Sequence, residues 1–240
     1  MPLLEVRNVS RRFGGIVALD GVSFEVQAGE DIGLIGPNGA GKTTIFNVIS
    51  GLYRPDQGDV VLDGRPITRT APHRIAGRGL ARTFQNLQLF GTMTVEENVL
   101  LGTHGRDGWG RGRVARRHAR DAIDYVGLGA LARRPVAELP HGQQKRVELA
   151  RALAAAPRLV LLDEPAGGLD HEEVEALARF LRGLRRDLDV TVVLVEHHMH
   201  LVMSVSERVY VLDFGRQIAA GTPQEVQADP AVIEAYLGEQ

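Results

Sequence analysis

The chain of 240 residues contains 44% hydrophobic and 24% charged residues, the balance of a globular protein with a well-formed core. Its 28 lysine and arginine residues nearly match its 30 aspartate and glutamate residues, and a formal net charge of -2 argues against a nucleic-acid-binding protein. The absence of cysteine excludes disulfides and thiolate metal sites and is typical of proteins in a reducing compartment.

The sequence shows no segment suited to a membrane. Its first ten residues, MPLLEVRNVS, lack a charged leader followed by an apolar stretch. No uninterrupted apolar run approaches the roughly 20 residues that a transmembrane helix needs. We therefore expect the chain neither to enter nor to cross a membrane by itself.

Extended segments dominate the N-terminal part of the chain. Residues 3–9 form one extended candidate, and residues 22–26 alternate between apolar and polar side chains as in a half-buried strand. The dipeptide Asp63-Gly64 predicts a tight hairpin turn. We expect antiparallel strands in this region, together with one central strand.

Three short apolar runs lack this alternation and are too short for buried helices, as expected for strands that are covered on both faces. They are DIGLIG at 31–36, RLVLLD at 158–163 and VTVVLV at 190–195. A helical pattern follows each run, at residues 42–50, 172–186 and 198–206. This order of elements predicts an α/β fold with a parallel core sheet.

The pattern between the first two of these runs changes. Residues 86–155 are mostly helical and predict a helical subdomain inserted in the sheet domain. Near its start lies a glycine- and arginine-rich stretch at 102–120, GTHGRDGWGRGRVARRHAR. A solvated loop and polar helix face explains this stretch, and contact with a partner or with lipid headgroups is the alternative. Further along, Thr222 and Glu225 fit a capping box, and Pro230 fits the start of another short helix.

The segment GPNGAGKTT at residues 36–44 follows an apolar strand and opens a helix, which is the setting of the G-x-x-x-x-G-K-[ST] phosphate loop. Its glycines allow successive N–H groups to turn toward phosphate oxygens. Lys42 places a positive charge at the β and γ phosphates, Thr43 supplies a hydroxyl for Mg²⁺, and Thr44 approaches the α phosphate. The nucleotide-binding residues expected in this loop are Gly36, Asn38, Gly39, Ala40, Gly41, Lys42, Thr43 and Thr44.

Two carboxylates follow the apolar run at 158–163. Asp163 ends the predicted strand and is suited to hold Mg²⁺ through a water molecule. Glu164 is expected to point the opposite way along the pleat, where it can polarise an attacking water. Acidic pairs after strands also occur as caps of the next element, but beside a phosphate loop the metal and water roles are favoured.

Six short motifs follow one another along the chain. They are the phosphate loop, RTFQN, a Leu-x-x-Gly-Gln helix start, LLDEP, AGGLD and VEH. In this order and spacing they resemble the nucleotide-binding subunits of ABC transporters, over essentially the whole chain. The resemblance implies an α/β P-loop NTPase of the ABC ATPase type that uses ATP and Mg²⁺. It also implies a single ATP-binding domain over 1–240. The nucleotide-binding α/β lobe of this domain covers 1–85 and 156–240 and includes an antiparallel β subdomain, and a helical subdomain covers 86–155.

The resemblance assigns roles to residues outside the phosphate loop. Phe13 matches the aromatic residue that stacks on adenine, although on its own it is equally well explained as a core residue. Gln85 matches the glutamine that reaches Mg²⁺ or the attacking water and reports the nucleotide state to the membrane partner. His197 matches the histidine that holds the γ phosphate, and Asp170 matches the aspartate that links the two active sites of a dimer. The implied catalytic residues are Glu164, His197 and Gln85, and the implied metal ligands are Thr43, Gln85 and Asp163.

The helix start ELPHGQQ departs from the commonest family pattern, Leu-Ser-Gly-Gly-Gln. In the family this turn binds the γ phosphate held by the phosphate loop of a second subunit, so the resemblance implies a homodimer or a heterodimer with a paralogue. Pro140 removes the serine hydroxyl and has no N–H to replace it, yet it suits the first helical position. His141 either supplies a substitute hydrogen bond or is a neutral surface spacer. Gly142 and Gln143 complete the expected phosphate contact.

Three longer segments are similar to the ATPases of branched-chain amino acid importers, within a wider group that imports hydrophobic amino acids, amides and urea. They are RTFQNLQLFGTMTVEENVL, VEHHMHLVMSVSERVYVLDFGRQIAAGTP and the ending VIEAYLGE. The similarity implies a motor subunit at the cytoplasmic face of the cell membrane, bound to permease subunits and served indirectly by a substrate-binding protein, without a nucleic-acid partner. Two alternatives stay open: the ATPase of a lipid or lipopolysaccharide exporter, whose tail is similar, and a soluble ABC ATPase without a transport role.

Overall fold

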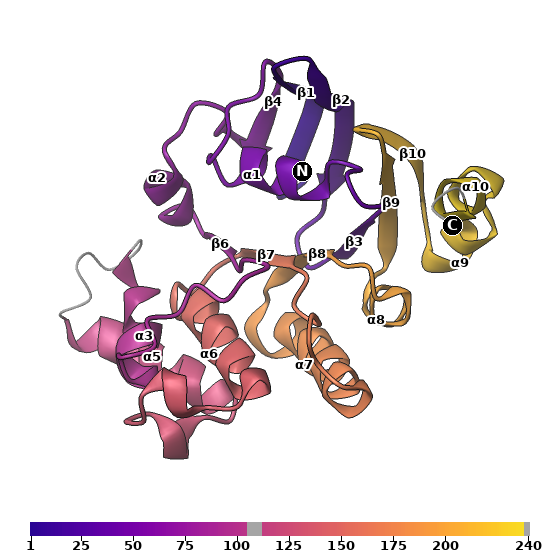
Figure 1. Cartoon of the computed structure of the whole chain (residues 1–240). Helices are drawn as coiled ribbons and strands as arrows, with labels where there is room; N and C mark the ends of the chain where they lie inside the picture. The colour runs from indigo at the N-terminus through magenta and orange to yellow at the C-terminus, as the bar shows by residue number, and fades with distance from the viewer. Residues whose placement is uncertain (105–111, 238–240) are drawn as a thin grey trace.

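The computed structural model describes residues 1–104 and 112–237. In these residues an antiparallel sheet is built from the strands β1 (Leu4–Phe13), β2 (Ile16–Val26), β4 (Gln57–Leu62) and β5 (Arg65–Pro66). Their order across the sheet is β2-β1-β4-β5, and the sheet lies at the top of Figure 1. The prediction of antiparallel strands near the N-terminus is confirmed.

The hairpin predicted at Asp63-Gly64 joins β4 to β5, with Leu62 paired to Arg65. The φ angles of 51° at Asp63 and 70° at Gly64 give the left-handed conformation that a type I′ turn requires at both central positions. The first strand is longer than the sequence predicts, because β1 continues to Phe13.

A second sheet carries the three apolar runs. Its strands are β3 (Asp31–Ile35), β6 (Leu80–Arg82), β7 (Leu159–Asp163), β8 (Thr191–Val195), β9 (Arg208–Asp213) and β10 (Arg216–Gly221). Within the described part of the chain their order is β10-β9-β3-β8-β7-β6, and β10 alone runs antiparallel to its neighbour. Every residue of β3, β7 and β8 is buried, so the predicted parallel core sheet is confirmed.

Alternate residues of the parallel strands pack into two separate cores. In β7, Leu159 and Leu161 belong to a core shared with the antiparallel sheet and helix α1 (Lys42–Ile49). Val160 and Leu162 belong to the core on the opposite face. The helices of that face include α6 (His141–Ala154), α7 (His171–Leu188) and α8 (Met199–Val205).

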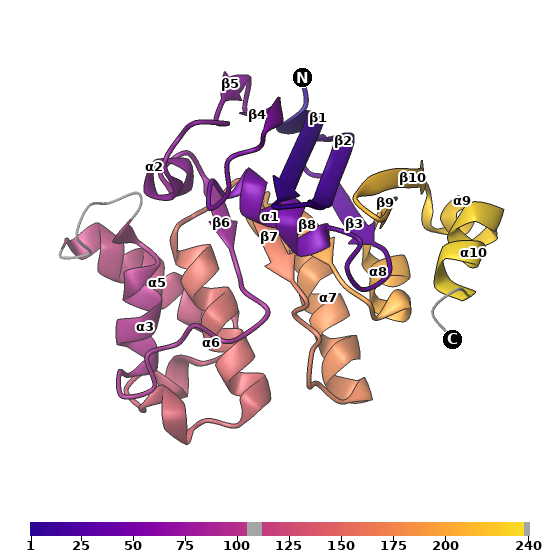
Figure 2. The same ribbon diagram turned by 45° about the horizontal axis from the view of Figure 1, so that its top comes forward.

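The segment between β6 and β7 is mostly helical where the structure describes it, as predicted. Helices α3 (Val95–Leu101), α5 (Arg113–Tyr125) and α6 contact one another and form a group beside the parallel sheet, visible in Figure 2. Two short 3₁₀ turns, η1 (Gly129–Leu131) and η2 (Val136–Glu138), connect α5 to α6. The exact division of the chain at 85 and 155 stays a prediction.

The arginine-rich stretch at 102–120 falls partly on residues 105–111, which lie outside the described residues. From Arg113 onward it forms α5, whose buried side includes Ala115 and Ala119. Its arginines at 113, 116, 117 and 120 are exposed, in agreement with a polar helix face.

The other helices in the described residues are short. They are α2 (Pro72–Ala76), α9 (Pro223–Ala228) and α10 (Pro230–Leu237). The predicted capping box at the start of α9 is confirmed, because Thr222 Oγ1 accepts a hydrogen bond from the N–H of Glu225 at 3.3 Å and Glu225 Oε2 accepts one from the N–H of Thr222 at 2.8 Å. No helix in the described parts of the chain has the length and apolar composition to cross a membrane.

Candidate active site

The phosphate loop at 36–41 joins β3 to α1 and packs tightly against neighbouring strands. Gly36 has a φ of 149°, and a side chain there would overlap the carbonyl oxygen of Leu212 in β9. Gly41 has a φ of 102°, and an added Cβ would lie 2.6 Å from the carbonyl oxygen of Ala18 in β2. Only glycine fits at both positions. Its freedom of backbone conformation lets the main chain wrap around the N-terminus of α1. The main-chain N–H groups and the dipole of a helix N-terminus favour an anion at this place.

Lys42 begins α1 and turns its side chain back over the loop. Its Nζ is buried and donates hydrogen bonds to the carbonyl oxygens of Gly36 at 2.5 Å and Pro37 at 2.8 Å. A positive charge therefore lies over the same main chain that the helix N-terminus makes favourable to anions, which suits a triphosphate. Exposed residues of the loop and of the first turn of α1 are Asn38, Gly39 and Thr43, whereas Gly36, Ala40, Gly41 and Thr44 are buried or half-buried.

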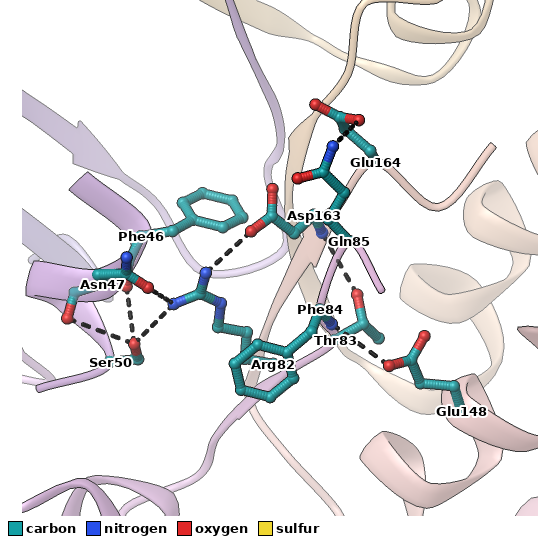
Figure 3. Close-up of polar contacts among 10 residues, drawn as sticks. All are labelled: Phe46, Asn47, Ser50, Arg82, Thr83, Phe84, Gln85, Glu148, Asp163 and Glu164. Atoms are coloured by element: carbon teal, nitrogen blue, oxygen red, sulfur yellow. Dashed lines mark hydrogen bonds and ion pairs between the residues drawn. The ribbon is translucent and has the colours of Figure 1, made fainter. Parts of the chain in front are cut away.

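Asp163, the last residue of β7, forms a buried ion pair with Arg82 of β6 (Figure 3), with 2.8 Å between Arg82 Nη2 and Asp163 Oδ2. Arg82 Nη1 also donates to Asn47 Oδ1 at 2.7 Å and to Ser50 Oγ at 3.0 Å, both at the C-terminal end of α1. Burial raises the pKa of Asp163, and the guanidinium of Arg82 opposes this rise. The ion pair therefore connects the strand edge to the helix behind the phosphate loop.

The second oxygen of Asp163 tests whether a metal ion fits this site. Oδ1 is buried and has no hydrogen-bond partner among the described residues. Such an oxygen is costly to bury, and a metal-bound water would satisfy it. The exposed Thr43 hydroxyl and the Gln85 amide oxygen add ligands of the kind that Mg²⁺ prefers. The available donors therefore fit Mg²⁺.

Glu164 lies one residue beyond β7. The prediction that it continues the alternation of side chains along the strand was wrong. Its φ of 48° places it in the left-handed region, so the alternation of the strand no longer applies. Gln85 Nε2 donates a hydrogen bond to Glu164 Oε2 at 2.9 Å, as Figure 3 shows. The Nδ1 of His197 lies 3.8 Å from the same oxygen. The fold thus brings together the three side chains expected to be catalytic.

The turn before α6 differs from its prediction by one residue. Pro140 has φ of -54° and ψ of 152° and is the N-cap of α6, so the prediction of proline at the first helical position was wrong. His141 is exposed, and a Cβ added at Gly168 would lie 3.1 Å from its ring Cε1. A Cβ added at Gly142 would overlap Oε1 of Glu173 in α7, so Gly142 faces this carboxylate closely. This turn therefore packs against the start of α7 in its own chain.

Asp170 and Phe13 lie in surroundings that the sequence analysis does not predict. Asp170 is the N-cap of α7, where its carboxylate accepts a hydrogen bond from the N–H of Glu173 at 2.9 Å.

Phe13 is 38% exposed, and its ring meets the ring of Tyr53 edge-on with 5.2 Å between the centroids, so Phe13 is not a core residue. The guanidinium carbon of Arg11 lies over the Phe13 ring, 4.7 Å from its centroid. Gln143 is half-buried in the first turn of α6.

Sequence reasoning missed two features of the site. Arg82 has no local signal, because its pair with Asp163 depends on β6 lying next to β7. The capping box at the start of α7 does have a signal, since the spacing Asp-x-x-Glu at Asp170 and Glu173 matches the pattern recognised at Thr222.

A phosphate loop at the carboxyl edge of a parallel sheet, beside a strand that ends in one carboxylate and is followed by a second, is the arrangement of P-loop ATPases. A family model described as ABC transporter matches residues 19–167, and one described as Branched-chain amino acid ATP-binding cassette transporter matches residues 216–240. The chain belongs to the ABC transporter family. It is an ATP-binding protein and an ATPase, as the sequence predicts.

Relatives of known role match nearly the whole chain. The High-affinity branched-chain amino acid transport ATP-binding protein BraF of Pseudomonas aeruginosa is 42% identical, over 99% of this chain and 98% of that protein. The corresponding LivG protein of Escherichia coli is 39% identical over the same shares. The Sulfate/thiosulfate import ATP-binding protein CysA 2 of Chromobacterium violaceum is 42% identical over 98% of this chain, but the match covers 63% of that protein.

Solved structures confirm the fold. The crystal structure of a nucleotide-free ATP-binding cassette from an ABC transporter has a TM-score of 0.90 and 32% identity, over 98% of this chain and 99% of that one. A dimeric ATP-binding cassette in a post-hydrolysis state, bound to ADP and phosphate, has a TM-score of 0.80 and 29% identity, over 92% of this chain and 98% of that one. The predicted α/β fold of the ABC ATPase type is therefore confirmed.

Proposed function

We propose that this chain is the ATP-hydrolysing motor subunit of an importer for branched-chain amino acids or for other hydrophobic amino acids or amides. The observation that carries the proposal is the match to two branched-chain amino acid transport proteins, which covers nearly the full length of this chain and of each relative. The sulfate import protein is as similar in identity, but more than a third of it has no counterpart in the match. The C-terminal match at residues 216–240 adds a second indication of the same substrate class.

The residues of the site divide the chemistry of hydrolysis among them. The phosphate loop and Lys42 hold the β and γ phosphates of ATP. Glu164 accepts a hydrogen bond from the attacking water and receives its proton as the general base. Gln85 and His197 orient that water, because both side chains approach the same oxygen of Glu164. Gln85, Glu164 and His197 lie in the loops that follow β6, β7 and β8, at the carboxyl edge of the sheet.

The metal site is proposed at the same edge. Thr43 and Gln85 would hold Mg²⁺ directly, and Asp163 would hold it through water by the oxygen that Arg82 leaves unpaired. The ion supplies positive charge that neutralises the phosphate oxygens during transfer.

A second subunit completes each site in this proposal. The N-cap Pro140 and the first turn of α6, with His141, Gly142 and Gln143, meet the γ phosphate held by the partner, since the N-terminus of a helix attracts an anion. Asp170 lies beside this turn and contacts the partner across the same interface. The similar dimeric cassette bound to ADP and phosphate supports a dimer, of two identical chains or of this chain with a paralogue.

A membrane permease is proposed to bind at the groove next to Gln85, which places the chain on the cytoplasmic face of the membrane. The groove has a volume of about 420 Å³, and exposed apolar side chains line it, among them Leu52, Phe84 and Phe90. Exposed apolar patches of this kind are typical of protein interaction sites. Because Phe84 directly precedes Gln85, a partner in the groove would contact the loop that reaches Glu164.

Purification from native membranes tests this function. We expect a pair of permease subunits to co-purify with the chain, and ATP hydrolysis by the reconstituted complex to rise with a binding protein loaded with leucine or isoleucine. Recovery of soluble proteins alone would contradict a transport role. A rise with lipopolysaccharide or sulfate, but not with amino acids, would contradict the substrate class.

A further inference from the structure

Glu196 follows β8 immediately before His197 and holds a buried charge that the chemistry above does not use. Its side chain is 0% exposed. Oε1 accepts a hydrogen bond from the N–H of Ala166 at 2.7 Å, and Oε2 accepts hydrogen bonds from the N–H groups of His197 at 3.1 Å and His198 at 3.2 Å. A carboxylate is stable in this buried position because three main-chain donors point toward it.

These hydrogen bonds continue the pairing of β7 with β8 beyond the ends of the strands. Asp163 is the last residue of β7 paired with Val195, and the N–H of Glu164 still donates to the carbonyl oxygen of Val195 at 2.9 Å. The left-handed backbone of Glu164 then turns the chain out of strand geometry. Two residues later, Ala166 donates to the side chain of Glu196 in place of a backbone carbonyl. The carboxylate therefore bridges the two loops where the ladder of main-chain bonds ends.

The loop at 164–170 is also held from its other side. Lys145 of α6 is 7% exposed, and its Nζ donates a hydrogen bond to the carbonyl oxygen of Glu164 at 3.3 Å. Glu164 thus lies between a contact from α6 and one from the end of β8. The contact from Glu196 differs in that it also binds the main chain of His197.

We propose that Glu196 is a positioning residue for ATP hydrolysis, which fixes the loop that carries Glu164 relative to the loop that carries His197. The inference rests on the roles proposed for those two residues. A displacement of about 1 Å in a catalytic group can lower a rate by about 10². The hydrogen bonds of Glu196 go to Ala166, His197 and His198 rather than to the phosphate loop, so ATP binding should depend on it little.

Substitutions at Glu196 test this role through the separation of kcat from KM. Glu196→Gln keeps the size of the side chain but turns an amide N–H₂ toward main-chain donors, which leaves at least one donor unpaired. We expect its kcat to fall by about tenfold or more, and its KM for ATP to change by less than about threefold. Glu196→Asp retains the charge but is one methylene shorter, so we expect an intermediate loss of kcat. The matched control is Asp31→Asn, which removes a buried carboxylate at the far end of β3 and should keep the wild-type kcat.

A combined substitution tests whether Glu196 acts through His197. Single-turnover hydrolysis of ATP is measured for Glu196→Gln, for His197→Ala and for the double variant. If Glu196 positions the His197 loop, the loss in the double variant is clearly smaller than the product of the two single losses. A multiplicative loss would mean independent action and would overturn the inference.

Further outcomes separate this inference from the proposed function. A wild-type kcat in both Glu196 variants, or a change confined to KM, overturns the positioning role. If circular dichroism shows that Glu196→Gln does not fold, Glu196→Asp decides by the same separation of kcat from KM. Hydrolysis near wild type in Glu164→Gln would overturn the proposed general base, whereas its loss together with unaffected Glu196 variants overturns the positioning role alone.

Discussion

The side-chain amide of Gln85 donates a 2.9 Å hydrogen bond to the carboxylate of Glu164, although the two residues are 79 positions apart in the chain. The bond connects the loop after β6 to the carboxylate that is proposed to activate water. Phe84, the neighbour of Gln85, lies in the groove proposed for the permease. A partner that moves this loop would therefore change the hydrogen bonding of Glu164, which gives a physical link between transport and hydrolysis.

Substitution of the proposed general base should separate binding from hydrolysis. In Glu164→Gln we expect hydrolysis to fall by about 10² to 10⁴, the usual contribution of general-base catalysis. ATP binding should persist, because the phosphate loop and Lys42 are unchanged, and the ATP-bound dimer should accumulate. Size-exclusion chromatography with saturating ATP and Mg²⁺ measures the dimer. A variant that stays monomeric and hydrolyses ATP like the wild type would contradict the assignment.

The parts of the site that could be predicted from the sequence are those encoded by neighbouring residues. The phosphate loop at 36–44 is one continuous segment, whose residue types and spacing are those of the G-x-x-x-x-G-K-[ST] motif. The ion pair between Arg82 and Asp163 joins residues 81 positions apart. Its existence depends on the order of strands in the sheet, which the sequence analysis leaves undefined.

Local rules failed where one element ends and another begins. The alternation of a strand does not reach Glu164, because this residue lies one position past β7 and its backbone has already left the strand region. Proline suits the first helical position, but Pro140 has an extended ψ of 152°, and the helix starts at His141. Element boundaries are uncertain by one or two residues, so a role that depends on one position requires the structure.

Arg82 should contribute strongly to stability. Arg82→Met leaves the carboxylate of Asp163 buried without its cation, and loss of one partner of a buried pair costs about 3 to 5 kcal/mol. Urea unfolding followed by circular dichroism measures the cost. The double variant Arg82→Met/Asp163→Asn should recover part of it, because no buried charge is then left unpaired.

The matched control is an exposed arginine in an ion pair. The side chains of Arg134 and Glu138 are both more than half exposed, with 3.1 Å between Arg134 Nη2 and Glu138 Oε2. Arg134→Met should therefore lower the free energy of unfolding by only about 0 to 1 kcal/mol. Equal losses in Arg82→Met and Arg134→Met would contradict the importance of the buried pair.

Asp31 at the start of β3 should make stability depend on pH. Burial, assisted by the negative charge of Glu207 and opposed by Arg185, raises the pKa of Asp31 to about 7. In the unfolded chain this carboxyl ionises near pH 4, at about its ordinary pKa of 3.9. Between these pH values the folded chain keeps a proton that the unfolded chain has lost, so the stabilising contribution is fully present below about pH 4 and is lost as the pH rises through about 7.

Urea unfolding at a series of pH values checks this expectation. The free energy of unfolding of the wild type should fall relative to that of Asp31→Asn as the pH rises from about 4 to about 7. A constant difference between the two proteins across this range would show that Asp31 does not titrate abnormally in the folded chain.

Pro140 offers a test of the unusual turn that is proposed to contact the partner's ATP. A serine at this N-cap position supplies a hydroxyl, and a hydrogen bond to a charged group is typically worth about 1.5 to 3 kcal/mol, or roughly ten- to 150-fold in affinity. The loss of proline costs about 0.4 to 1 kcal/mol through the unfolded chain, while a serine N-cap returns about 1 kcal/mol. Pro140→Ser should therefore leave the thermal stability of the chain nearly unchanged.

Dimerisation should respond more strongly than stability to this substitution. We expect Glu164→Gln/Pro140→Ser to dimerise at lower ATP concentrations than Glu164→Gln alone, as measured by analytical ultracentrifugation. Pro140→Ala in the same background is the control, because it removes the proline without adding a hydroxyl. If serine and alanine shift the dimer equally, the hydroxyl does not reach the phosphate. The turn would then hold the γ phosphate through Gly142, Gln143 and the N-terminus of α6, with His141 packed against Gly168 of its own chain.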